Sequence, residues 1–154
     1  MIKIMFVCHG NICRSPMAEF IMKDMSQSMG YAHKMQIASC ATSTEEIGNS
    51  VYPPAKRELA LHGIQTGGKR AVQLTKSDYE NYDMLIAMDD NNVRNIYRML
   101  GGDPLNKVTK LLDYTSKGGD VADPWYCGNF DKTYADIHSG CQALIKHLTD
   151  NNLL

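Results

Sequence analysis

The stretch IKIMFVCHGNICRSPMAE, residues 2–19, decides the fold because an apolar run leads directly into a polar loop and a helix start. Residues 2–7 are almost continuously apolar and rich in strand formers, which is typical of a central parallel strand buried on both faces. Ser15 and Pro16 then mark the start of a helix, and Gly30 marks its end. We therefore predict a buried strand, a tight loop and a helix in this order.

The rest of the chain alternates between strand and helix patterns. It predicts strands over 35–40, 83–89 and 107–114, and helices over 53–63, 90–102 and about 131–149. This alternation is typical of βαβ units, so we expect a parallel sheet with helices on both faces. Because ligands bind beyond the carboxyl ends of parallel strands, the loops after Val7 and Leu112 are expected at the same edge of the sheet.

Composition and charge exclude several classes of protein. The 154 residues fit one domain, 1–154, that can bury a real core. Sixteen basic and 17 acidic residues are mixed along the chain with a formal net charge of -1, which argues against a nucleic-acid surface. The N-terminal apolar run is too short for a signal peptide, and no run reaches the roughly 18 apolar residues of a membrane span. We therefore expect a cytoplasmic protein with no nucleic-acid or membrane partner.

The five cysteines do not indicate a disulfide scaffold. Their number is odd, and in a reducing compartment most of them are expected to be thiols. There is no C-x-x-C motif and no second pair at zinc-site spacing, so we expect no metal. We interpret Cys40, Cys127 and Cys141 as structural residues.

The loop over residues 8–15 lies where an α/β fold best receives an anion. The free amide groups of a helix's first turn and the positive end of the helix dipole both point there. Gly10 and Asn11 tolerate the left-handed backbone that a loop wrapped around an anion requires. The position of the loop therefore predicts a phosphate site.

Three side chains of this loop suit attack on phosphorus. The positive field favours the thiolate form of Cys8, which is a nucleophile. Arg14 carries two N–H groups that match two phosphate oxygens, and Ser15 can hydrogen-bond the sulfur as it leaves. The C-x5-R spacing occurs by chance in many chains, and a free cysteine is often only a small buried hydrophobe. It is the placement between strand and helix that favours catalysis.

The segment VCHGNICRSPMAE, residues 7–19, resembles the signature VCxGNxCRSPxAE of the low-molecular-weight protein tyrosine phosphatases at every specified position. Chain length and element order fit that family over essentially the whole chain. The resemblance implies a single-domain, three-layer α/β sandwich, flavodoxin-like, with a four-stranded parallel sheet in the order 2-1-3-4. It also implies a phosphocysteine intermediate, no metal or other cofactor, phosphotyrosine-containing proteins as partners, and inhibition by phosphate-like oxyanions.

The family also uses a general acid from an Asp-Pro pair near the C-terminus, and DPWY at residues 123–126 supplies such a pair. The tyrosyl oxygen must be protonated as it departs, and a carboxylic acid can do this and then accept a proton from the attacking water. We therefore predict Cys8 as nucleophile, Arg14 as phosphate clamp and Asp123 as general acid and base. Alone, an Asp-Pro pair indicates only a turn.

The resemblance assigns further positions one by one. The phosphate-binding or supporting positions are His9, Gly10, Asn11, Ile12, Cys13, Ser15 and Ser39; the substrate groove takes Ile12, Glu45, Trp125 and Tyr126. A flat aromatic wall suits a phosphotyrosine ring. Cys13 can form a disulfide with Cys8 under oxidation, and the alternative is an inert thiol packed under the loop.

Three positions depart from the family pattern. Lys69 and Val72 stand where members often have the first and last residues of a His-x-Ala-Arg stretch, so we assign this segment no catalytic role. Glu45 stands in place of an aromatic residue, which makes the groove more polar.

Three other functions remain open at this point. Arsenate reduction on the same fold needs a relay of further cysteines, and none lies between Cys40 and Cys127. Phosphoarginine hydrolysis is typical of relatives with a threonine where this chain has Ile12. A phosphate-binding module without catalysis is disfavoured because the nucleophile, clamp and acid occur together.

Overall fold

Strand β1 (Ile2–Cys8) is the centre of the sheet, and six of its seven residues are buried. It pairs in parallel with β2 (Met35–Ala41) along its whole length and with β3 (Met84–Ala87) on its other side. β4 (Val108–Lys110) pairs with β3, so the order is β2-β1-β3-β4. This computed structural model describes residues 1–154 and confirms the predicted four-stranded parallel sheet of order 2-1-3-4.

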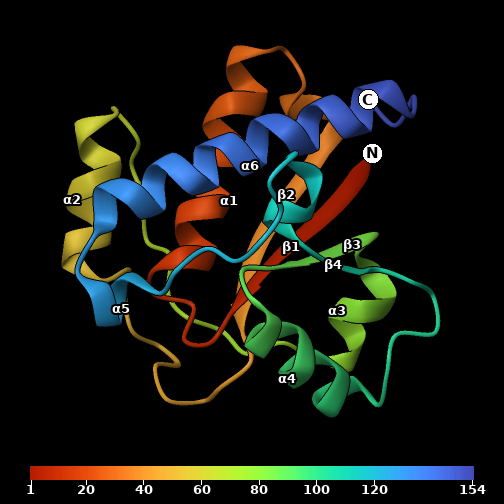
Figure 1. Cartoon of the computed structure of the whole chain (residues 1–154), viewed down its shortest axis with the longest axis horizontal. Coiled ribbons are helices and arrows are strands. Elements are labelled where there is room, and N and C mark those ends of the chain that lie inside the picture. Colours follow the sequence, from red (N-terminus) through yellow and green to blue (C-terminus); the bar gives the residue numbers. More distant parts are fainter.

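Helices cover both faces of this sheet (Figure 1). The helices are α1 (Arg14–Ser28), α2 (Pro53–Leu61), α3 (Lys76–Asn81), α4 (Asp90–Leu100), α5 (Pro124–Cys127) and α6 (Phe130–Asp150), with 3-10 turns η1 (Ala32–Lys34) and η2 (Leu111–Tyr114). Helices α1, α2 and α6 share one core with the sheet, and α3 and α4 share the other. The three-layer α/β architecture is therefore as predicted. None of these helices combines the length and the apolar character that a membrane crossing requires.

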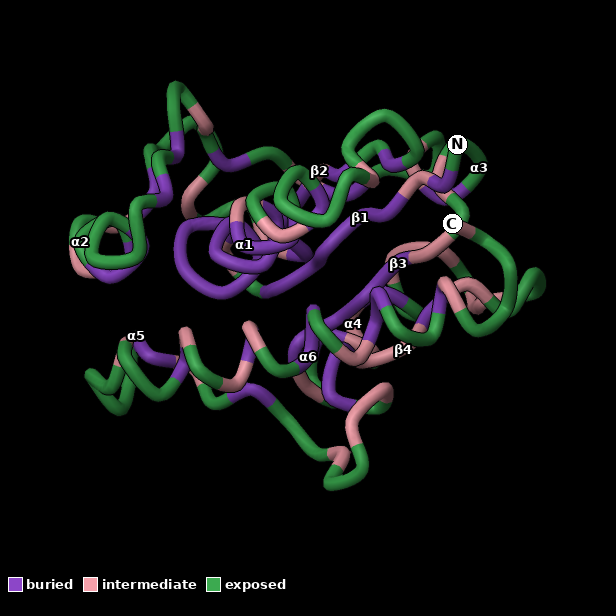
Figure 2. The backbone as a smooth tube through the Cα atoms, turned by 90° about the horizontal axis from the view of Figure 1, so that it is seen from above, coloured by how far each residue is buried: buried purple, intermediate pink, exposed green.

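The alternation of side chains along β1 produces the two cores. Ile4 and Phe6 point toward α1 and α6, whereas Met5 and Val7 point toward α3 and α4. All four side chains are at most 4 % exposed. Seen from above, the purple tubes of β1 and of the start of α1 lie inside, and the outer helices are green on their solvent side (Figure 2). The strand that ends in Cys8 is thus fixed from both sides.

The fourth strand is shorter than the sequence predicted. The pattern over 107–114 indicated one strand, but β4 ends at Lys110, and Leu111 and Leu112 are buried in η2 instead. Its partner β3 ends at Ala87, which pairs with Lys110, so no ladder is available beyond that point. The side chain of Asp113 accepts the N–H of Lys110 at 3.0 Å and closes the turn.

Two short helices were not predicted. Helix α3 begins at a capping box in which Thr75 and Asp78 each accept the other's backbone N–H, at 3.1 and 2.9 Å. Helix α5 is a single turn after Asp123 and ends at Gly128, whose φ is +70°. Both are too short to show the apolar periodicity by which the longer helices were recognised.

Candidate active site

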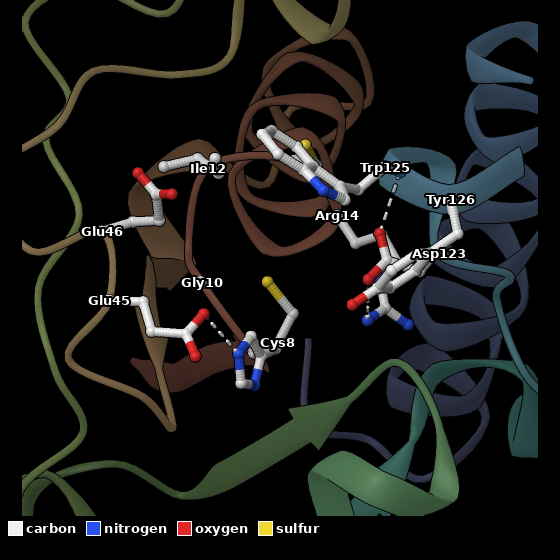
Figure 3. A pocket seen from close by; sticks show the side chains of 11 residues that line it. Cys8, Gly10, Ile12, Arg14, Glu45, Glu46, Asp123, Trp125 and Tyr126 are labelled. Carbon is white, nitrogen blue, oxygen red and sulfur yellow. Dashed lines mark hydrogen bonds and ion pairs between the residues drawn. The ribbon is translucent and has the colours of Figure 1, made fainter. Parts of the chain in front are cut away.

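The loop between β1 and α1 surrounds the sulfur of Cys8 with hydrogen-bond donors. The backbone N–H groups of Asn11 and Ser15 point at Sγ, with nitrogen–sulfur distances of 3.3 and 3.4 Å. The hydroxyl of Ser15 lies 3.0 Å from the same sulfur. Such donors stabilise negative charge on the sulfur, as an oxyanion or thiolate site requires. In Figure 3 the sulfur of Cys8 points into the pocket between Ile12, Arg14 and Trp125.

Asn11 holds this loop in shape. Its φ of +58° is left-handed, a region that asparagine tolerates better than most residues. Its amide nitrogen donates to the hydroxyls of Ser15 at 2.8 Å and Ser39 at 2.9 Å, and its amide oxygen accepts the N–H of Val72 at 3.1 Å. The side chain therefore ties the loop to β2 and to the segment that follows α2.

A buried ion-pair cluster lies behind Ser39. The Ser39 hydroxyl donates to Glu19 at 2.6 Å, and Lys69 donates to the Ser39 carbonyl at 2.9 Å. Lys69 also lies 3.9 Å from Glu19. Burial lowers the pKa of Lys69, against the effect of Glu19. The sequence analysis assigned no catalytic role to Lys69 or Val72. In the structure Lys69 contacts Ser39 and Glu19, and the N–H of Val72 binds Asn11 in the loop.

Arg14 connects three segments of the chain. Its Nη1 donates to Asp89 at 2.6 Å and to the carbonyl of Val121 at 2.9 Å, and its Nη2 donates to Asp123 at 3.4 Å. Burial opposes the charge on Arg14, but the nearby Cys8, the hydrogen bond that Arg14 donates to Asp89, and the charges of Asp89 and Asp123 raise its pKa above the ordinary value. The guanidinium is therefore permanently charged and fixed in direction.

Asp89 is a residue of the site that the sequence analysis missed. It caps α4 by accepting the N–H of Asn92 at 2.8 Å with one oxygen, and it binds Arg14 with the other. The signal was available: Asp89 closes the strand predicted over 83–89, and carboxyl ends of parallel strands meet at the edge where ligands bind.

The pocket walls come from loops at that same edge. The residues that line it are Cys8, His9, Gly10, Ile12, Cys13, Arg14, Glu45, Glu46, Asp123, Trp125 and Tyr126. The structure thus brings the predicted loop, groove and acid residues together, with Asn11, Ser15 and Ser39 just behind. Glu46 was not predicted. The loops after β1 and after η2 meet here, as expected.

Two walls of the pocket differ in character (Figure 3). On one side Glu45 forms an ion pair with Nε2 of His9 at 3.0 Å, and both side chains are exposed. On the other side lie the half-exposed ring of Trp125 and the largely exposed ring of Tyr126. The ring of Tyr52 supports Trp125, with 4.7 Å between the ring centres.

The remaining cysteines have distinct environments. Burial, and then the nearby charge of Cys8, raise the pKa of Cys13 to about 12, so it is a neutral thiol at ordinary pH. Cys40 and Cys141 are fully buried, as a structural interpretation requires, but Cys127 is exposed. The interpretation of Cys127 as a structural residue is therefore wrong, because Cys127 is exposed at the C-terminal end of the short helix α5. Nowhere do three or more metal-ligating side chains cluster.

The chain matches a family of known proteins over nearly its whole length. The family description "Low molecular weight phosphotyrosine protein phosphatase" matches residues 3–153. The chain belongs to this family. The family assignment agrees with the loop that holds Cys8 and Arg14 and with the sheet order found above.

Individual relatives are similar over nearly their whole length. The protein-tyrosine-phosphatase YfkJ of Bacillus subtilis is 37% identical over 147 residues, 94% of each chain. Its crystal structure superposes with a TM-score of 0.95, covering 98% of this chain and 96% of that one, at 35% identity. The Schizosaccharomyces pombe phosphotyrosine protein phosphatase is 36% identical over 152 residues, covering 96% of this chain and 97% of its own length.

One similar structure is that of a phosphatase named for a different substrate. The YwlE arginine phosphatase, with a phosphorylated active-site serine, is 28% identical and superposes with a TM-score of 0.86, covering 99% of this chain and 100% of that chain.

Proposed function

We propose that this phosphatase hydrolyses phosphotyrosine in proteins and peptides, and small aryl phosphates, through a phosphocysteine intermediate. One observation carries the proposal: Cys8, Arg14 and Asp123 converge on a single pocket that has an exposed aromatic wall. A nucleophile, a cation and a carboxyl group are the three parts that hydrolysis of a phosphate ester with a poor leaving group needs.

In the first step the thiolate of Cys8 attacks phosphorus, and the bond from phosphorus to the tyrosyl oxygen breaks. Asp123 gives its proton to that oxygen, so the tyrosine side chain leaves as a neutral phenol. Arg14 and the backbone N–H groups of the loop stabilise the charge that spreads over the three equatorial oxygens. The phosphoryl group is then bonded to the sulfur.

In the second step a water molecule attacks the phosphocysteine. The carboxylate of Asp123 takes a proton from this water, and the sulfur–phosphorus bond breaks. The hydroxyl of Ser15, 3.0 Å from the sulfur, stabilises the thiolate as it leaves. Inorganic phosphate departs, and Asp123 is protonated for the next cycle.

The pocket walls support phosphotyrosine over phosphoarginine. Trp125 and Tyr126 offer flat faces against which an aromatic ring packs, and Ile12 adds an apolar edge. Phosphoarginine is the second candidate because an arginine phosphatase shares the fold at a TM-score of 0.86. Arsenate reduction lacks support, since no cysteine lies between Cys40 and Cys127 to relay electrons.

The deciding experiment compares turnover of phosphotyrosine, phosphoarginine and arsenate by the purified protein. We expect phosphotyrosine to have the highest kcat/KM. A higher kcat/KM for phosphoarginine would assign the chain to the second candidate. Inorganic phosphate is expected to inhibit competitively, since it binds the same loop.

The nucleophile is tested by Cys8→Ser. We expect no release of phosphate from p-nitrophenyl phosphate, while inorganic phosphate still binds, because the loop donors and Arg14 remain. Full residual activity of this variant would rule out the mechanism.

The acid is tested by Asp123→Asn and the choice of leaving group. Phenol departs less readily than p-nitrophenol, so kcat/KM for phenyl phosphate should fall about tenfold or more beyond the fall for p-nitrophenyl phosphate. An equal loss for both esters would remove Asp123 from the acid role.

The cellular setting follows from the thiol chemistry. A nucleophilic cysteine and four other free cysteines persist in a reducing compartment, which supports the cytoplasm.

A further inference from the structure

Lys110 lies at the end of β4 and binds two carboxylates that come from different segments. Its Nζ is 2.8 Å from Asp120 and 3.0 Å from Asp90, and only 15% of its side chain is exposed. The hydrogen bonds that Lys110 donates to Asp120, and then to Asp90, raise the pKa of Lys110 against the effect of burial. The ammonium group is thus charged at every pH at which the enzyme would be assayed.

Both partners of Lys110 stand beside residues of the active site. Asp90 is the first residue of α4 and directly follows Asp89, which binds Arg14. Asp120 precedes Asp123 by three residues in the segment that runs from η2 to α5 (Figure 1). Lys110 does not line the pocket, so it can influence the reaction only through the two segments that carry Asp90 and Asp120.

The segment that carries Asp123 has few other attachments. No helix or strand occurs between the end of η2 at Tyr114 and the start of α5 at Pro124. Between these points Val121 anchors it, donating its N–H to the carbonyl of Met88 at 2.9 Å and accepting from Arg14. The ion pair between Asp120 and Lys110 is the adjacent attachment, one residue before Val121.

We propose that Lys110 is a positioning residue for catalysis: by pairing with Asp120 and Asp90 it holds the Asp123 segment in register with Arg14 at the pocket. The inference rests on the proposed role of Asp123 as the acid. Partly exposed ion pairs contribute little to stability, whereas a shift of an acid by about 1 Å can cost up to about a hundredfold in rate. The effect of Lys110 is therefore expected in the rate of protonation more than in the stability of the fold.

The test compares kcat/KM for phenyl phosphate and p-nitrophenyl phosphate in Lys110→Met and Asp120→Asn. Each variant should lower kcat/KM about tenfold for the phenyl ester and no more than about threefold for the nitrophenyl ester. Lys110→Arg, which keeps the charge, should recover most of the loss. If Lys110→Met fails to fold, as judged by circular dichroism and thermal melting, Asp120→Asn carries the test.

The matched control is Lys132→Met, which removes a lysine from the exposed ion pair with Asp136 on α6, where Nζ and Oδ2 are 2.7 Å apart. It should leave both kcat/KM values unchanged. Equal losses for the two esters in Lys110→Met, or none, would overturn the inference.

A double-mutant cycle separates this inference from the proposed function. In an Asp123→Asn background, Lys110→Met should cause no further change in the ratio of the two kcat/KM values, because the group it positions is gone. A further change would show that Lys110 acts elsewhere and would overturn the inference. If Asp123→Asn alone leaves the ratio unchanged, the acid role itself fails, and the positioning role fails with it.

Discussion

At the scale of single residues, Asn11 combines a left-handed backbone conformation with a set of side-chain hydrogen bonds, which few residue types can do. Its backbone occupies the left-handed region, and its side chain makes three hydrogen bonds, to Ser15, Ser39 and Val72. The first property lets the loop turn around the sulfur, and the second keeps it turned. Substitutions can separate the two, because glycine keeps the first and loses the second, whereas alanine loses both.

We therefore expect Asn11→Ala to be less stable than Asn11→Gly by about 1 kcal/mol, since a Cβ at positive φ costs more than alanine gains from its less flexible unfolded chain. In both variants the missing side-chain hydrogen bonds should lower the free energy of unfolding by about 2–4 kcal/mol relative to the parent, and in Asn11→Ala the backbone strain adds to this loss. Urea unfolding measures these differences. Equal stability of the two variants would mean that the backbone conformation carries no strain.

The same two variants show whether catalysis depends on the side-chain hydrogen bonds of Asn11. Both lack the bonds that keep the loop turned, so both should lose about tenfold or more in kcat/KM for p-nitrophenyl phosphate. Kinetics of Asn11→Gly close to the parent would show that the loop holds its shape without the side chain.

At the scale of elements, the packing of α6 on η2 depends on one glycine. A Cβ added at Gly140 would lie 2.5 Å from Cγ and 2.9 Å from Cδ2 of Leu111, which is too close for either atom. Leu111 is fully buried and belongs to the core that also contains Phe6 and Ile137. Glycine at this position therefore lowers the helix propensity of α6 but lets the helix pack closely against Leu111.

Gly140→Ala should for this reason destabilise the protein. Helix propensity alone favours the substitution by about 1 kcal/mol, and overpacking costs about 1–3 kcal/mol, so we expect a net loss of about 1 kcal/mol by urea unfolding. Ser139→Ala, at an exposed position of the same helix, is the control and should change stability by less than about 0.5 kcal/mol. A gain in stability from Gly140→Ala would contradict the close approach.

Elements with a long periodic pattern were predictable, and those set by their neighbours were not. β1 and the long α6 were located from apolar runs and spacing to within one or two residues. β4 was placed correctly at its start but not at its end, because the end depends on where β3 stops. The turn of helix after Asp123 depends on a capping bond, the Trp125 N–H to Asp123 at 3.0 Å, rather than on periodicity.

At the scale of the whole molecule, the active site is assembled from distant parts of the chain by the strand order. Arg14 binds Asp89, 75 residues away, and the carbonyl of Val121, 107 residues away. The strand-loop-helix around Cys8 was recognisable from local sequence, whereas Asp123 was found only through the family resemblance. Asp89 was missed although its place at the end of a predicted strand was a signal, whereas nothing in the local sequence indicated that Lys110 would bind both Asp90 and Asp120.

Three buried thiols should make the whole fold sensitive to alkali. Burial raises the pKa of Cys13, Cys40 and Cys141 in the folded protein, whereas an unfolded cysteine has a pKa of about 8.5. Above that pH the unfolded chain releases these protons and the folded protein keeps them. The free energy of unfolding therefore falls as pH rises, by up to about 1.4 kcal/mol per pH unit for each thiol.

Cys141→Ala tests this sign. The variant loses apolar contacts and is less stable at all pH values, but its stability should decline less steeply between pH 9.5 and 10.5, by up to about 1.4 kcal/mol per unit. Urea unfolding in the presence of a reductant at several pH values gives the slopes. Identical slopes for parent and variant would show that Cys141 does not keep its proton in the folded state.

The central position of β1 also places Cys8 and Asp123, the proposed nucleophile and the proposed acid, in different units of local unfolding. Cys8 ends a strand that is hydrogen-bonded on both sides and packed in both cores, so its amides open only with the sheet itself. Asp123 belongs to a segment held by a few contacts, and such segments open at a smaller free-energy cost. Fluctuations short of global unfolding are therefore expected to displace Asp123 while the loop around Cys8 stays intact.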